Sequence, residues 1–312
     1  MIDMALRSQG VGGSEIAAIC GLDPRRDAFA VYVDKIGLLE RAAPNTRMKW
    51  GKRLERVIAE AYGEETGQVV RWHDCTVLHP TRTWQAATPD AFVVDLVAGC
   101  SLGGVDAKNV SFDQAAQWGE PGTDLVPQPI ALQLQWYCST FDLPWWDAAA
   151  LFGGNDLRIF RIHRDAEIEA ALLEAADDFW RRHVLARVPP PPGHSPATTD
   201  ALRKMFPRNV EACRYATPEE GELLAQLKTV GEEWDEVNGR YAAIENQVKL
   251  AIGEGEGLIF GKAKVTWKRC VDSVGPKWQE IAESMGATPE LIKAHIGVTK
   301  QGSRRMHCSF GK

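Results

Sequence analysis

Long hydrophobic runs are absent from this 312-residue sequence, and no apolar stretch approaches the ~18–20 residues of a membrane-spanning helix. The first residues, MIDMALRSQG, lack a basic start followed by an apolar stretch, so no secretory signal is predicted. The seven cysteines are scattered and form no CxxC pair, which argues against a disulfide framework and against a zinc or iron–sulfur knuckle. We therefore expect a cytoplasmic protein with reduced thiols and no membrane partner.

Several common catalytic motifs are also missing. The seven histidines show no HxH or HExxH spacing, which argues against a zinc hydrolase, and there is no GxSxG motif or Walker loop. Apolar residues make up 45% of the chain and charged residues 25%, proportions that are typical of globular proteins and disfavour disorder. The length predicts roughly two domains.

The net charge of −6 is unevenly distributed. Residues 258–312 carry 10 Lys and Arg against 4 Asp and Glu, whereas the rest of the chain is acidic. This basic end could follow phosphates, although a charged face is usually only solvated surface. Its cations include Lys262, Lys264, Lys268, Arg269, Arg304 and Arg305.

The clearest boundary is the proline-rich stretch RVPPPPGHSPATT at 187–199, which favours a stiff extended spacer. We predict one domain over 1–187, a linker over 188–199 and an accessory region over 200–312. The accessory region is expected to hold a long helix at about 217–252, whose heptad register looks too ragged for a coiled coil. A hairpin at 257–269, two small helices at 276–285 and 289–295 and a last strand at 304–310 complete it.

Before the linker the pattern is mixed α/β. Helices are predicted at 14–20, 27–37, 46–66, 128–141 and 165–186, and strands at 68–78, 83–95, 102–110, 146–153 and 157–162. In the helix at 46–66, Leu54, Val57, Ile58, Ala61 and Tyr62 form the apolar stripe. This order predicts an α/β core with a mixed sheet flanked by helices.

The strongest chemical signal is TPDAFVVD followed by GGVDAKNV. Pro89 interrupts strand pairing, which suits an exposed Asp90 at a sheet edge or bulge. Asp106 and Lys108 are two apart in an apolar strand and so share one face, where they are costly to bury unless paired or bound. Carboxylates from adjacent strands could bind Mg²⁺, with Lys108 beside the attacking water. A plain salt bridge between Asp106 and Lys108 is the simpler alternative.

Two helical residues join this cluster on helical-wheel geometry. Glu55 lies at the border of the buried stripe of its helix, from where a carboxylate can reach the sheet edge. On the helix at 128–141, Gln133 lies closer to the apolar stripe than Gln135, which is placed on the polar side. Gln133 is therefore the glutamine expected to face inward and to hold a phosphate oxygen or a metal-bound water.

These motifs resemble the YqaJ-like viral recombinase domain, the phage lambda exonuclease branch of the PD-(D/E)XK nucleases. The resemblance runs over residues 7–186. It is carried by Arg7 with GVGGSEIAAICGLDP (Ser14), MKWGKRLERVIAEAY (Glu55), TPDAFV (Asp90), VDAK (Asp106 and Lys108), PIALQLQWYCST (Gln133) and DFWRRHV. The sequence departs from relatives in two places, with aspartate in place of the commoner glutamate at 106 and isoleucine in place of tyrosine at 130.

The resemblance implies a restriction-endonuclease-like fold and a Mg²⁺-dependent 5′-to-3′ exonuclease that acts on linear double-stranded DNA ends. Mn²⁺ could replace Mg²⁺. It further implies that Glu55, Asp90 and Asp106 bind the metal, that Lys108 and Gln133 complete the catalytic set, and that Arg7 and Ser14 hold the 5′-phosphate. Family relatives leave a 3′ overhang for a strand-annealing partner, and they often form ring-shaped homo-oligomers, commonly trimers, in the bacterial host cytoplasm.

Two alternatives stay open at this stage. The chain could be another PD-(D/E)XK enzyme, such as a restriction-like endonuclease, which would also cut closed circular DNA. It could instead be a non-catalytic module that binds DNA ends or an annealing protein through a vestigial site. The role of residues 200–312 is equally open between partner docking or oligomer formation and a plain accessory fold.

Overall fold

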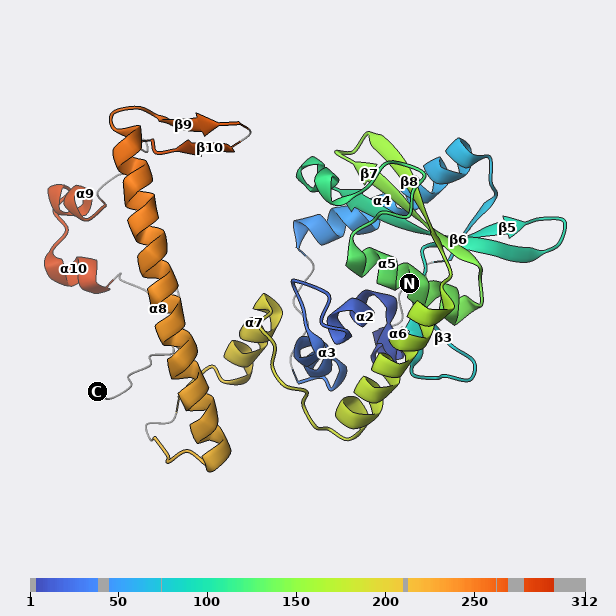
Figure 1. The fold of residues 1–312 in the computed structure, drawn as a ribbon, viewed down its shortest axis with the longest axis horizontal. Helices are drawn as coiled ribbons and strands as arrows, with labels where there is room; N and C mark the ends of the chain where they lie inside the picture. The colour runs from blue at the N-terminus through green and yellow to red at the C-terminus, as the bar shows by residue number, and fades with distance from the viewer. Residues whose placement is uncertain are drawn as a thin grey trace. The chain divides into compact units, whose positions relative to one another are not determined.

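The computed structural model describes residues 4–38, 45–73, 75–209, 213–261, 263–268 and 278–294. The chain divides into two compact units, Met1–Pro207 and Arg208–Lys312 (Figure 1). No helix within the described ranges is long and apolar enough to cross a bilayer.

Unit 1 is built on a five-stranded mixed sheet of order β2-β5-β6-β7-β8. Only the β6–β7 pair is parallel, and the other neighbours are antiparallel. A smaller sheet of order β1-β4-β3 lies beside it in the same unit. The strands are β1 (Val11–Gly12), β2 (Val70–Trp72), β3 (Val77–Leu78), β4 (Gln85–Ala87), β5 (Ala91–Asp95), β6 (Cys100–Val110), β7 (Trp145–Phe152) and β8 (Asp156–His163).

Helices cover both faces of the large sheet (Figure 1). One face packs on α4 (Thr46–Thr66) through a small cluster that includes Tyr62, Val105 and Ala149. The other face packs on α5 (Gln128–Phe141) through a larger cluster around Trp136 and Trp146. Alternate strand residues feed the two clusters, as the two-residue period of a strand requires. The predicted α/β core with a mixed sheet flanked by helices is confirmed.

The remaining elements of unit 1 close the α5 side. They are α1 (Met4–Ser8), α2 (Gly13–Ile19), α3 (Ala28–Lys35), a short 3₁₀ segment (Phe112–Gln117), α6 (Ala166–Phe179) with its π-helical extension (Trp180–Leu185), and α7 (Pro196–Met205). Asp27 caps α3 by accepting a hydrogen bond from the Ala30 N–H, and it also accepts one from the Thr198 hydroxyl. The hydrogen bond between Thr198 and Asp27 connects α7 to unit 1. The boundary between the two units accordingly falls after Pro207 rather than at the predicted linker.

Unit 2 is organised around α8 (Pro218–Ile252), a single uninterrupted helix (Figure 1). The hairpin β9 (Gly257–Phe260) and β10 (Ala263–Thr266) follows it, and then α9 (Trp278–Ser284) and α10 (Pro289–Ala294). The hairpin and both small helices were predicted from the sequence. The predicted strand at 304–310 and the cations Lys262, Arg269, Arg304 and Arg305 lie outside the described residues.

Two sequence expectations about helix faces are wrong. Val57 is 55% exposed and Ala59 takes its place in the buried stripe of α4, because only a narrow strip of that helix meets the sheet. Gln135 is buried rather than on a polar face. Its amide group donates to the carbonyl of His163 and accepts from the N–H of Asp165, so the turn between β8 and α6 covers that side of α5.

Candidate active site

The site forms where β5 ends and β6 continues. This is the N-terminal end of β5: its first residue, Ala91, pairs with Val105, while β6 runs on beside β7 as far as Val110. The N–H of Ala107 therefore has no β5 partner, and it donates instead to Asp90 Oδ2 at 2.9 Å. Pro89 precedes this aspartate and carries no N–H with which to prolong the ladder. The sheet opening thus fixes Asp90, which is half-buried rather than exposed as predicted.

Asp106 and Lys108 point together to the α5 side of β6. Asp106 is 2% exposed, and its Oδ2 atom forms an ion pair with Lys108 Nζ. Gln133 of α5 contacts both groups, since its Oε1 accepts from Lys108 Nζ at 3.2 Å and its Nε2 lies 3.4 Å from Asp106 Oδ1. The same Nε2 donates to the Tyr137 hydroxyl at 2.9 Å, which fixes the orientation of the amide.

Glu55 approaches from α4, as its place on the helical wheel predicted. Its side chain is 22% exposed, and Oε2 lies 2.7 Å from Lys52 Nζ, one turn earlier on the same helix. Glu55 raises the pKa of Asp90, so the two carboxylates interact across the opening. The third acidic side chain predicted for the site is thus present at the same place.

A cavity of about 150 Å³ joins these groups. It contains all seven side chains that the sequence predicted for the site. Its lining comprises Arg7, Gly12, Gly13, Ser14, Lys52, Glu55, Thr88, Asp90, Asp106, Ala107, Lys108, Gln133 and Tyr137. One cavity therefore holds a carboxylate cluster together with a lysine, an arginine and a serine.

The carboxylate cluster carries an excess of negative charge. Burial, and then the carboxylates of Asp106 and Glu55, raise the pKa of Asp90 well above its usual range. Burial alone would lower the pKa of Lys108, but the nearby carboxylates of Asp106, Asp90 and Glu55 together outweigh it and raise that pKa. Lys108 is therefore a protonated ammonium group at neutral pH.

The oxygen-rich lining fits a hard divalent cation in chemical type. Glu55, Asp90 and Asp106 offer carboxylate oxygens, which Mg²⁺ prefers, and a cation would offset the repulsion that raises the pKa of Asp90. Over the described ranges, no three His, Cys, Asp or Glu side chains are arranged as a ready metal-ligand set. Here the ammonium groups of Lys108 and Lys52 lie against Asp106 and Glu55 and balance part of their charge.

Arg7 and Ser14 form another part of the cavity wall. Arg7 Nη2 donates to Ser14 Oγ at 2.9 Å, and Ser14 lies in the first turn of α2. Gly13 permits this helix to approach α5, because a Cβ there would lie only 2.6 Å from a ring carbon of Tyr137. An arginine, a hydroxyl and a helix N-terminus at one place can bind an anion.

A buried ion pair, missed by the sequence reasoning, supports this wall. Lys35 Nζ lies 2.7 Å from Glu15 Oε2, with the two side chains 0% and 2% exposed. Lys35 also donates to the carbonyl oxygen of Arg7 at 2.8 Å, and Glu15 accepts from the N–H of Gly12 at 2.8 Å. The pair thus links α3 to the backbone on both sides of the anion-binding wall.

Lys52, Thr88 and Tyr137 are further cavity residues that the sequence reasoning did not assign to the site. Two of them carried a usable signal. Lys52 is three residues before Glu55 on one helix, and Tyr137 is four residues after Gln133 on another, so each pair shares a helix face. Thr88 had no such signal, since it contributes through its carbonyl oxygen, which accepts from the Tyr137 hydroxyl at 3.1 Å.

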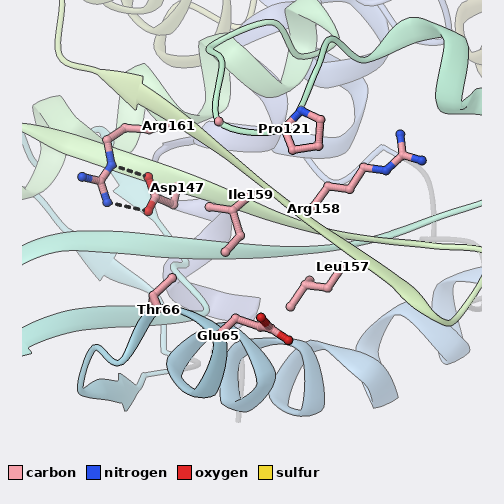
Figure 2. Close-up of a pocket in the computed structure, with 9 residues that line it drawn as sticks. Glu65, Thr66, Pro121, Asp147, Leu157, Arg158, Ile159 and Arg161 are labelled. Carbon is pink, nitrogen blue, oxygen red and sulfur yellow. Dashed lines mark hydrogen bonds and ion pairs between the residues drawn. The ribbon is translucent and has the colours of Figure 1, made fainter.

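A second, larger cavity of about 540 Å³ lies on the α4 face of the sheet (Figure 2). Its buried carboxylate, Asp147, accepts two hydrogen bonds from Arg161 and one from the Tyr62 hydroxyl at 2.7 Å. The other arginine of this cavity, Arg158, pairs with Asp156. The charges of Asp147, Arg161 and Arg158 are thus each matched by a neighbouring side chain.

Comparison with known proteins agrees with the motif-based resemblance. Residues 4–142 match the YqaJ-like viral recombinase domain family. The uncharacterized protein YqaJ of Bacillus subtilis (strain 168) is 25% identical over 272 residues, which cover 86% of this chain and 82% of that protein. The family resemblance predicted from the sequence is confirmed.

Two solved structures also resemble part of this chain. An alkaline exonuclease (LHK-Exo) from Laribacter hongkongensis superposes with a TM-score of 0.48 at 21% identity, over 59% of this chain and 92% of that one. A phage related exonuclease from Haemophilus somnus 129PT superposes with a TM-score of 0.41 at 12% identity, over 57% of this chain and 96% of that one.

Proposed function

We propose that this chain, whose residues 4–142 form a YqaJ-like viral recombinase domain, is a Mg²⁺-dependent exonuclease that hydrolyses phosphodiester bonds at the ends of linear double-stranded DNA. The observation that carries the proposal is the single cavity that holds Glu55, Asp90, Asp106, Lys108 and Gln133 together. Carboxylates beside the ammonium group of Lys108 match what phosphoryl transfer needs, namely a metal site and a group that stabilises developing negative charge.

Glu55, Asp90 and Asp106 would hold the Mg²⁺ ion, with Mn²⁺ as a substitute. The ion would act as a Lewis acid and make bound water more acidic. Lys108, which keeps its proton at Nζ, donates a hydrogen bond to a phosphate oxygen or to the attacking water. Gln133 positions both Lys108 and Asp106 through its amide group.

The wall formed by Arg7 and Ser14 would bind the 5′-terminal phosphate. A strand end held there would present its first phosphodiester to the carboxylates that line the same cavity. This arrangement favours 5′-to-3′ removal of nucleotides, which leaves a 3′ overhang. The product would suit a single-strand annealing protein in phage-type homologous recombination in the bacterial host cytoplasm, with the enzyme as a homo-oligomeric ring, commonly a trimer in relatives.

Cleavage of labelled linear duplex tests the proposal. Wild type and Lys108→Ala are incubated with duplex labelled at either the 5′ or the 3′ end, in Mg²⁺ or in EDTA. Wild type should release mononucleotides from the 5′ end in Mg²⁺ but not in EDTA. Lys108→Ala should release them at least a hundredfold more slowly. Arg56→Ala, which alters an exposed ion pair on α4, serves as the matched control.

The other functions predict different results. Nicking or linearisation of closed circular DNA would identify an endonuclease. Duplex binding without any Mg²⁺-dependent product would identify a non-catalytic end-binding module. Equal degradation by wild type and Lys108→Ala would show that the active site has been assigned wrongly.

A further inference from the structure

The long helix α8 carries an apolar stripe that the described parts of unit 2 leave open to solvent. Its members are large side chains with exposed fractions between 38% and 68%. They recur at alternating steps of four and three residues, which is the a/d repeat of a coiled coil. We call them the α8 seam, and they are Leu223, Leu227, Val230, Trp234, Val237, Tyr241 and Ile244.

The exposed large side chains of α8 repeat more regularly than the heptad pattern of the whole helix suggested in the sequence analysis. Apolar residues outside the seam, such as Leu224 and Leu250, blur the pattern when only hydrophobicity is considered. The seam covers three heptads, about 30 Å of helix. A stripe this long on one helix has the length of a helix-pairing surface.

We propose that the α8 seam pairs with the α8 seam of a second copy of this chain, in antiparallel orientation. Side-chain size favours this orientation. Antiparallel pairing about a point between Trp234 and Val237 sets Trp234 against Val237 of the second copy, and Tyr241 against Val230. Each of these layers contains one large and one small side chain, and the next layer sets Leu227 against Ile244, two side chains of similar size, so space is filled evenly.

Parallel pairing would fill the seam unevenly. It would set Trp234 against Trp234 and Tyr241 against Tyr241 of the second copy, while Val230 and Val237 would each face themselves. Crowded layers would then alternate with underfilled ones, and both defects destabilise an interface. The sequence of the seam therefore selects the antiparallel pair.

Charge supports the same arrangement. Glu233 and Arg240 are exposed and flank the seam on one side. In the antiparallel pair, Glu233 lies beside Arg240 of the second copy, and the symmetry of the pair repeats this contact. Glu232, Asp235 and Glu236 fall on the outer faces of the helix, so its acidic residues do not oppose one another. A homotypic partner thus satisfies both size and charge.

Sedimentation equilibrium of the full chain over a concentration series tests the surface. Val237→Glu should lower the average mass, because it places a carboxylate in the seam while glutamate keeps helix propensity. Leu250→Glu is the matched control, since Leu250 is 85% exposed on the same helix but outside the seam. Any association through unit 1 persists in both variants. Equal masses for wild type and Val237→Glu would overturn the proposal.

Charge reversal tests the partner and the orientation. Glu233→Arg and Arg240→Glu should each weaken association about tenfold, because two attractive contacts become repulsive. An equimolar mixture of the two variants should regain wild-type association, since every contact is again between opposite charges. In a parallel pair Glu233 would face Asn238, so an unaffected Glu233→Arg would overturn the orientation. A mixture no tighter than its components would overturn pairing between copies.

Discussion

Replacing Lys35 by methionine should destabilise unit 1 strongly, because it leaves the Glu15 carboxylate buried without its cation. Both side chains are at most 2% exposed, and 2.7 Å separates Lys35 Nζ from Glu15 Oε2. Removal of one partner from such a pair costs about 3–5 kcal/mol, since the remaining charge stays desolvated. For a unit of this size the melting temperature should fall by roughly 10 °C.

The double variant separates charge from packing. Methionine approximates the volume of lysine, and Glu15→Gln keeps an oxygen that can accept from the N–H of Gly12. Glu15→Gln combined with Lys35→Met should therefore recover most of the lost stability, because no uncompensated charge remains. The free energy of unfolding is measured by urea titration, followed by tryptophan fluorescence, for both single variants and the double variant.

An exposed ion pair supplies the control. On α4, 2.9 Å separates Arg56 Nε from Glu60 Oε1, but the two side chains are 70% and 60% exposed. Arg56→Met should cost less than about 1 kcal/mol. If Lys35→Met were no more damaging than Arg56→Met, or if the double variant were as unstable as the sum of the singles, the buried pair would not act as an electrostatic unit.

Two further predictions concern named hydrogen bonds. Burial acts to raise the pKa of Asp27, but hydrogen bonds from Thr198 and Ser195 outweigh it and lower that pKa. The ionised Asp27 therefore stabilises the fold fully above the pKa of an unfolded aspartate, near 4, and this stabilisation is lost as pH falls through the folded pKa. Acid titration of the unfolding midpoint should consequently be shallower in Asp27→Asn than in wild type, and identical titrations would contradict this. Tyr137→Phe should lower the turnover of linear duplex about tenfold with little change in DNA affinity, because Gln133 loses the hydroxyl that orients its amide. Single-turnover kinetics would exclude that role if affinity fell and turnover did not.

Local signals delimit the two helices that flank the sheet, and both helices were predicted over the ranges that the structure shows. Asn45 caps α4 by accepting from the N–H of Met48, and Gly67 ends it in the left-handed conformation. A proline in the first turn opens α5. These are short-range effects of backbone geometry and hydrogen bonding, so the sequence shows them directly.

Long-range contacts were not predictable in this way. Glu15 and Lys35 are twenty residues apart and resemble surface charges, and only the packing of α3 against α2 buries them together. Gln135 resembles a polar-face residue until the turn after β8 covers it. In both cases burial is decided by an element distant in sequence, and helical periodicity carries no information about that element.

The location of the candidate site follows from unequal strand lengths. β6 has eleven residues and β5 has five, so β6 keeps β7 as a neighbour after β5 has ended. The uncovered edge of β6 exposes backbone N–H groups that must find other acceptors. Asp90 accepts the hydrogen bond from one of them, the N–H of Ala107. The same edge faces the cavity in which Asp106, Lys108 and Glu55 meet. Two aspartates distant in sequence are brought together here because the backbone needs an acceptor at the position where the sheet opens.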